Sequence, residues 1–181
     1  VWSGDGWPLS PPDFLDLHEQ STSFETFGVY SPGTVNVGLE NAQAVPGVRA
    51  TAGVLPAVGV AAARGRLLTE DDCREGAAPV AVISHTLWQQ TFGGDPGLVG
   101  RAIRLNGADF TVVGIMPANF EFAAPWMRTE DCQVWLPYSF TAKERTQRDS
   151  HWLCGVARLK PGASVGSADA EIKAIGRKLT A

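Results

Sequence analysis

The sequence lacks the features that mark a membrane span or a nucleic-acid-binding surface. No stretch approaches the roughly 18 consecutive apolar residues that a membrane-spanning helix needs, and the run Ala57–Ala63 is short and ends at Arg64. Positive charge is scarce, since 15 Lys and Arg stand against 19 Asp and Glu and give a net charge of −4. This balance argues against nucleic acid as a partner, because binding phosphates requires a basic face.

Cysteine is also scarce, with only Cys73, Cys132 and Cys154 in the chain. Their spacings are long, and no Cys-x-x-Cys pair suited to a metal site occurs. One disulfide with a leftover thiol and three buried thiols are both compatible with this count. The pairing and the redox compartment therefore stay open.

The remaining composition is that of an ordinary globular protein. Hydrophobic residues make up 44% and charged residues 19% of 181 residues, enough for one domain or two small subdomains. The chain opens with Val1 and without a signal peptide, and it ends in helical sequence. We therefore expect an excised fragment, so the missing membrane spans say nothing about the parent protein.

Four segments carry helix signals. Ser10 is placed to cap a helix over Pro11–Gln20, and Ser84 to cap one over His85–Phe92. A short, irregular helix is expected over Gly53–Val60. The last helix spans Val165–Leu179, where a single apolar stripe lies along one face: Val165, Ala168, Ile172, Ile175 and Leu179.

Strand signals fill much of the rest. The β-prone segments are 24–30, 34–39, 45–51, 80–83, 134–137 and 152–159, with Ser31-Pro32-Gly33 as a turn between the first two. Asn106-Gly107 predicts a type I′ hairpin within 101–116. That turn places Arg104 opposite Asp109 and puts Ile103 and Phe110 on the same face. The expected class is α+β.

Eight short phrases, together with matching segments near both ends, resemble one family over about Pro11–Leu179. It is the family of MacB-like periplasmic core domains of bacterial ABC-transporter permeases, of the FtsX/MacB type. The likeness extends to large permeases with duplicated halves found in acidobacteria. The phrases, in order, are Val58–Val60 with Arg64–Arg66, Val80–Ser84, Leu87–Trp88, Phe92–Pro96, Val99–Arg101, Ile103–Gly107, Phe110–Pro117 and Val134–Pro137. The segment Gly47–Pro56 departs from the pattern, because the family usually has an aromatic residue there.

The resemblance implies two subdomains. A porter-like layered α/β unit would be built from both chain ends, residues 1–52 and 150–181, and a mixed α/β sabre-like unit, residues 53–149, would be inserted in it. The domain would lie on the periplasmic or extracellular side of the inner membrane, between two membrane helices of the parent. It would couple a cytoplasmic ATPase to the outer side of the membrane, as in efflux, with a periplasmic adaptor as a further partner. The parent would be dimeric or have duplicated halves.

The reactive side chains point to structural roles. His151 and Cys154 are three apart, which suits a metal on a helix, but on a strand they face opposite ways. Ser84-His85 lacks a G-x-S-x-G elbow and fits a helix cap. Gly93-Gly94-Asp95 follows a helix, as a C-cap does, and is not a phosphate loop.

The remaining candidates are also ambiguous. Glu70-Asp71-Asp72 lacks the alternation of a calcium loop and reads as a solvated helix start, with Thr69 as its cap. Trp88 and Trp135 are expected in the core. Trp2, Trp7 and Trp126 are expected either in an exposed binding patch or in ordinary packing.

We therefore assign no catalytic, cofactor-binding or metal-binding residue, and no cofactor. The primary hypothesis is a non-enzymatic domain that works by mechanical coupling and partner interaction. A soluble ligand-binding or adaptor module is the alternative, which a deep apolar cleft with converging polar groups would favour. A hydrolase is the second alternative, and it would need a nucleophile, a base and an orienting group within reach of one another.

Overall fold

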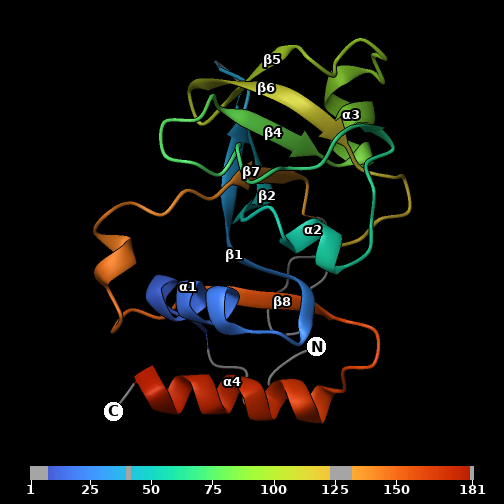
Figure 1. Cartoon of the computed structure of the whole chain (residues 1–181). Helices are drawn as coiled ribbons and strands as arrows, with labels where there is room; N and C mark the ends of the chain where they lie inside the picture. Colours follow the sequence, from blue (N-terminus) through green and yellow to red (C-terminus); the bar gives the residue numbers. More distant parts are fainter. Residues whose placement is uncertain (1–7, 40–41, 123–131, 180–181) are drawn as a thin grey trace.

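The computed structural model describes residues 8–39, 42–122 and 132–179 and shows a mixed sheet with helices around it (Figure 1). Among these residues, no helix combines the length and apolar character required to cross a bilayer. The elements are α1 (Pro11–Gln20), β1 (Phe24–Val37), β2 (Gln43–Ala50), α2 (Val54–Ala57), β3 (Arg64–Gly65), β4 (Val80–Ile83), α3 (His85–Phe92), β5 (Ala102–Leu105), β6 (Ala108–Ile115), β7 (Val134–Pro137), η1 (Glu144–Thr146), β8 (Cys154–Leu159) and α4 (Val165–Leu179).

Six of the strands close into a ring. The sheet runs in the order β2-β7-β4-β6-β5-β1-β8, and β1 also pairs with β2. The pairs β2–β7 and β4–β6 are parallel, and the others are antiparallel. The ring is closed between β5 and β1 by a single residue pair, Val37 with Leu105. We call β1, β2, β7, β4, β6 and β5 the ring.

Strand β1 leaves the ring and continues into a second layer. Its first half pairs with β8, from Phe24–Leu159 to Tyr30–Cys154, and its second half pairs with β2, from Tyr30–Ala50 to Val37–Gln43. Figure 1 shows α1 and β8 between the ring and α4. We call α1, β8, α4 and the first half of β1 the base.

The expected turn at Ser31-Pro32-Gly33 is wrong, because β1 runs through it without a break. Pro32 pairs with Val48 of β2, while β8 ends its pairing with β1 at Tyr30. Beyond Tyr30 the opposite side of β1 is thus a strand edge until Val37, and proline is tolerated at an edge because no ladder bond needs its missing N–H.

The central hairpin follows the predicted register. Leu105 pairs with Ala108, Arg104 with Asp109 and Ile103 with Phe110. Both turn residues have positive φ, 51° at Asn106 and 79° at Gly107, as a type I′ turn requires. The Arg104 and Asp109 side chains form an ion pair of 3.0 Å.

The predicted caps are also confirmed. The Ser10 and Ser84 hydroxyls accept the backbone N–H groups of Asp13 and Leu87 and begin α1 and α3. The apolar stripe of α4 is only partly buried. Ala168 and Ile175 are buried, whereas Val165 in the first turn is 54% exposed.

The core forms three clusters. One lies within the ring against α3 and includes Trp88; a second lies under α1. The third joins the two layers, because it contains Tyr30 of β1 and Cys154 of β8 together with Val54 of α2 and Trp135 of β7. Trp88 and Trp135 are 7% and 0% exposed, which confirms their predicted place in the core.

The start of α2 lies so close to β1 that Gly28 of β1 and Gly53, which precedes α2, leave no room for a Cβ atom. A Cβ on Gly28 would clash with the backbone nitrogen of Val54 and stand 2.7 Å from the carbonyl carbon of Gly53. On the same strand, a Cβ on Gly33 would meet no atom within 4 Å.

We therefore expect Gly28→Ala to lower the free energy of unfolding by about 1–3 kcal/mol, as overpacking against a fixed backbone does. Gly33→Ala is the control and should be neutral or slightly stabilising, because alanine restricts the unfolded chain. Urea unfolding followed by circular dichroism measures both. Equal stabilities of the two variants would contradict the close approach.

Candidate functional site

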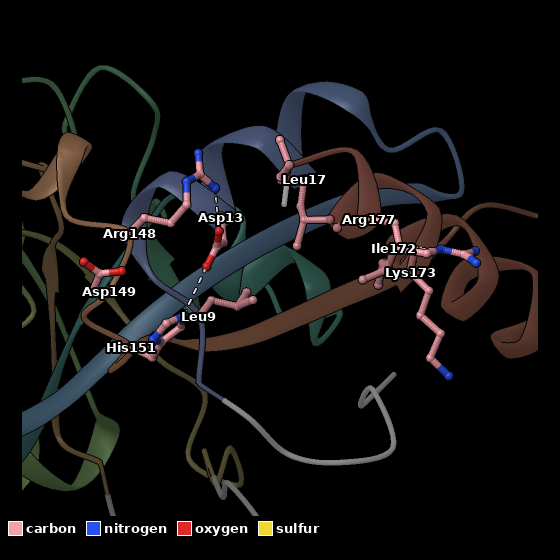
Figure 2. A pocket seen from close by; sticks show the side chains of 11 residues that line it. Leu9, Asp13, Leu17, Arg148, Asp149, His151, Ile172, Lys173 and Arg177 are labelled. Atoms are coloured by element: carbon pink, nitrogen blue, oxygen red, sulfur yellow. Dashed lines mark hydrogen bonds and ion pairs between the residues drawn. The ribbon is translucent and has the colours of Figure 1, made fainter. Parts of the chain in front are cut away.

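A groove of about 590 Å³ lies in the base between α1 and α4. Leu9, Leu17, Ile172 and Leu179 give it apolar walls, and charged side chains stand around them. Figure 2 shows Asp13, Arg148 and His151 at one end and Ile172 and Lys173 at the other. The groove brings together both ends of the chain and residues 138–153, which we call the β7–β8 connection.

Two carboxylates of α1 hold the β7–β8 connection. Asp13 and Asp16 are three residues apart and therefore share a helix face. The Arg148 guanidinium donates from Nη1 to Asp13 Oδ1 at 2.6 Å and from Nη2 to Asp16 Oδ2 at 2.7 Å. The cap of α1 orients the first carboxylate, since the Ser10 hydroxyl donates to Asp13 Oδ2 at 2.6 Å.

The electrostatics of this end favour the charged guanidinium. Hydrogen bonds, first to Asp16 and then to Asp13, raise the pKa of Arg148 above its usual value. His151 adds a second nitrogen, with Nε2 3.4 Å from Asp13 Oδ2. The carboxylates are the more buried partners, with side chains 23% and 28% exposed against 43% for Arg148.

Within the base, helix α4 is tied to the segment between α1 and β1 by a different carboxylate. Glu171 accepts hydrogen bonds from the backbone N–H of Thr22 at 2.8 Å, from the Thr22 hydroxyl at 2.6 Å and from the backbone N–H of Ser23 at 3.1 Å. These donors, the Thr22 hydroxyl above all, lower the pKa of Glu171 to about 2. Thr22 and Ser23 lie between α1 and β1, so this contact fixes α4 where the chain enters β1.

Aromatic side chains fill the space beneath α1. Phe14 packs on Phe27 and Phe140 with ring centroids 5.1 and 5.9 Å apart. In the β7–β8 connection, the Trp152 indole N–H donates to the Tyr138 hydroxyl at 2.9 Å. Burial raises the pKa of Tyr138. The connection is thus anchored by its two ends in the core and by Arg148 in the middle.

A second groove, of about 620 Å³, lies at the far end of the ring between the end of β1, α3 and β5. Leu39 at its rim is 64% exposed. Arg101 and Asp95 in its wall form an ion pair of 2.8 Å.

The structure separates most of the reactive side chains noted in the sequence. His151 reaches Asp13, whereas Cys154 is buried in the cluster between the layers. Ser84 serves as a helix cap, and the His85 ring packs on Trp88 at 5.3 Å. Within the described part of the chain, no group of three or more His, Cys, Asp and Glu side chains is placed to hold a metal ion.

The acidic residues Glu70-Asp71-Asp72 lie at the start of a turn that the ion pair between Arg66 and Asp72 closes. Arg66 binds Asp72 through two nitrogens at 2.5 and 2.9 Å, and the Thr69 N–H and hydroxyl both donate to Asp72 at 2.8 Å. The bond to Arg66 is the main cause that lowers the pKa of Asp72 to about 2. Residues 70–76 form turns and a bend where a short helix was expected. Gly93 ends α3 in the left-handed conformation, which confirms the C-cap.

The three cysteines, whose pairing the sequence left open, are free thiols in this structure. Burial raises the pKa of Cys73 to about 11 and that of Cys132 to about 12, so both thiols are poor nucleophiles at neutral pH. Trp2, Trp7 and Trp126, for which an exposed patch and ordinary packing were the two expectations, lie outside the described residues.

Sequence reasoning missed the role of Arg148. The segment 143–149 is rich in charged residues, as a solvated loop is, and none of the residues of η1 within it is buried. The sequence contains one signal for this contact. Asp13 and Asp16 lie on the same face of α1, and two neighbouring carboxylates favour a cation from another part of the chain as their partner.

The chain is similar to proteins of one known family. Residues 1–175 match a family model described as the MacB-like periplasmic core domain. No curated protein matches the chain significantly.

Three similar solved structures support the same fold. The periplasmic region of MacB from Actinobacillus actinomycetemcomitans is 16% identical, with a TM-score of 0.69 over 96% of this chain and 75% of that one. A domain assigned to a permease protein from Porphyromonas gingivalis is 17% identical, with a TM-score of 0.66 over 94% and 71%. The extracellular domain of the noncanonic ABC-type transporter YknZ from Gram-positive bacteria is 13% identical, with a TM-score of 0.59 over 93% and 79%.

The Glu171 contact makes a prediction about acid stability. The carboxylate has a pKa of about 2 when folded and an ordinary value of 4.5, so its contribution is complete above pH 4.5 and is lost as the pH falls towards 2. We expect Glu171→Gln to lower the free energy of unfolding at pH 7 by about 0.5–1 kcal/mol, the range of exposed charged contacts.

The measurement is urea unfolding at pH 7, 4.5 and 3. The difference between wild type and Glu171→Gln should shrink at the lowest pH. Glu25→Gln removes the same charge from an exposed position of β1 and serves as the control. If the loss of unfolding free energy in Glu171→Gln were the same at pH 7 and pH 3, the charge of the carboxylate would not contribute to stability.

Proposed function

The chain belongs to the family of MacB-like periplasmic core domains and is a periplasmic domain of an ABC-transporter permease, and from this premise we propose that it transmits movement mechanically. Membrane helices of the parent are implied by the family. We propose that movement enters the base through the segments near α1 and α4 and reaches the ring as a change in its position.

The observation that carries this proposal is the unbroken course of β1. A strand of 14 residues belongs to the base over its first half and to the ring over its second. A hydrogen-bonded strand cannot shorten, so a displacement of its first half also moves its second half. Tyr30, where the two pairings meet, is 1% exposed and bonded into the sheet on both sides.

The packing between the layers supports motion of the domain as one body. The shared core cluster contains residues of β1, β8, α2 and β7. The Val29 N–H donates to the Thr51 hydroxyl at 2.9 Å, and the Thr51 N–H donates to the Val29 carbonyl at 2.9 Å. A close-packed interior of this kind passes on a displacement because it is not readily compressed.

We retain the two-unit division as part of the proposal, with residues 1–52 and 150–181 as a porter-like unit and 53–149 as an inserted unit. The pairing of β1 suggests that the physical boundary crosses this strand near Tyr30, because β2 and residues 31–37 hydrogen-bond within the ring. Rigid-body movement would then involve both units through their common strand.

A non-enzymatic role agrees with the uses of the polar side chains. Ser84 is engaged in a helix cap, Asp72 in a turn, and Glu171 in fastening α4. A cytoplasmic ATPase and a periplasmic adaptor remain proposed partners, as does a parent that is dimeric or has duplicated halves. The groove between α1 and α4 favours the second candidate, a ligand-binding or adaptor module.

The proposal predicts a nucleotide-dependent displacement in the full-length permease. Spin labels would be attached at two exposed positions, Ala108→Cys on the hairpin of β5 and β6, which we call the distal hairpin, and Glu19→Cys on α1. Half-buried Cys73 would be replaced by Ser, while Cys132 and Cys154 are buried. The purified permease would be measured with its ATPase in lipid nanodiscs, without nucleotide and trapped with ATP.

We expect the distance between Ala108 labels on two copies, or two duplicated halves, to change on trapping, while the distance from Ala108 to Glu19 within one domain stays constant. That result would show that the domain moves as one rigid body. A ligand-binding module would show a displacement with ligand and none with nucleotide. If trapping with ATP leaves the distance between the Ala108 labels of two copies unchanged, the mechanical proposal is wrong.

A further inference from the structure

The ion pairs of this protein are distributed unevenly. Most join residues no more than six positions apart, such as Arg66 with Asp72 and Lys173 with Asp169. Among the described residues, those that span a longer stretch of sequence all end on Asp13 or Asp16 of α1, and they come from Arg148 and His151. A local pair stabilises a turn, whereas a long-range pair ties two parts of the fold together.

The arrangement at Arg148 requires a guanidinium. Two of its nitrogens bind two different carboxylates at 2.6 and 2.7 Å, and a lysine ammonium would have to span both from a single point. Asp13 is held in place by the Ser10 hydroxyl, so one acceptor is positioned before Arg148 binds. Charge-assisted bonds in such a fork are stronger than ordinary surface pairs.

The two helices of the base are therefore fastened differently. Helix α1 is bound to the β7–β8 connection, whose first end follows directly from β7 of the ring. Helix α4 packs beside α1 and is fastened at Glu171 to Thr22 and Ser23, and its C-terminal half lines one wall of the groove of about 590 Å³ (Figure 2). The hydrogen bonds of Glu171 thus join α4 to the residues just before β1 and not to the β7–β8 connection.

We propose that Arg148 is a clamp that makes α1 and the β7–β8 connection one mechanical piece, so that α1 follows the ring through β7 in addition to β1. The clamp is a conformational device, and Arg148, Asp13 and Asp16 are its positioning residues. The inference rests on the proposed function for its purpose, but the clamp itself is a property of this chain and is tested without nucleotide or membrane.

The first experiment measures amide hydrogen exchange of this chain at neutral pH. We expect Arg148→Met to speed exchange roughly three- to tenfold in the β7–β8 connection and in the first turns of α1, with α3 and the distal hairpin unchanged. Arg148→Lys should fall between wild type and Arg148→Met. Arg145→Met is the matched control, since Arg145 is exposed on the same connection and donates only within it, to the Phe140 carbonyl at 3.2 Å.

A charge reversal separates the clamp from simple loss of packing. Arg148→Asp alone should speed exchange at least as much as Arg148→Met, and adding Asp16→Arg, which leaves the bond between Ser10 and Asp13 in place, should restore part of the protection. Equal exchange in Arg148→Met and Arg145→Met, or no recovery in the reversed variant, would overturn the clamp.

The second experiment tests the coupling. In this chain, labelled at Ala108→Cys and Glu19→Cys and measured without nucleotide, we expect Arg148→Met to broaden the distribution of distances between α1 and the distal hairpin, and Arg145→Met to leave it unchanged. An unchanged width in Arg148→Met would show that α1 follows the ring through β1 alone, which overturns the inference. The proposed function fails by a separate result, the absence of a nucleotide-dependent change in the full-length permease.

Discussion

The structure depends on the hydrogen-bonded row in which Tyr30 stands between Cys154 and Ala50. At this one residue β1 changes partners, from β8 in the base to β2 in the ring. The Tyr30 side chain is buried in the cluster that joins both layers and packs edge-on against Phe122 at 5.1 Å. Burial also raises the pKa of its hydroxyl and keeps the side chain neutral. The two layers are therefore parts of one sheet and one core, which is why movement of the base is expected to move the ring.

Features that depend on neighbouring residues could be predicted from the sequence. The Asn106-Gly107 hairpin, the serine caps of α1 and α3, and the Asp169–Lys173 pair of α4 at 2.8 Å all involve groups within a few positions of each other. Family resemblance added the α+β class and the periplasmic location, which the comparisons confirm. Ser84 and Gly93 were correctly predicted as helix caps, because a cap involves only the residue and a few neighbouring backbone groups, whereas the expected helix start at Glu70-Asp71-Asp72 is a series of turns.

Features that depend on distant partners could not be predicted in the same way. Pro32 looked like a turn because its local signal is strong, and only the absence of a second strand beside it permits an extended conformation. The partner of Asp13 and Asp16 lies more than 130 positions away, and that of Glu171 nearly 150. The groove between α1 and α4 arises from these contacts and has no signature in either helix alone.

The closure of the ring has a mechanical consequence of its own. Between β5 and β1 the seam consists of one residue pair, with hydrogen bonds from Gly38 N–H to the Arg104 carbonyl and from Asn106 N–H to the Asn36 carbonyl. Every other junction of the ring has at least two residue pairs, and the β1–β2 junction has eight. If the ring were to open, it would therefore open first at the β5–β1 junction, which has the fewest paired residues, while β1 stays held on its other side by the longest junction of the ring, the one with β2.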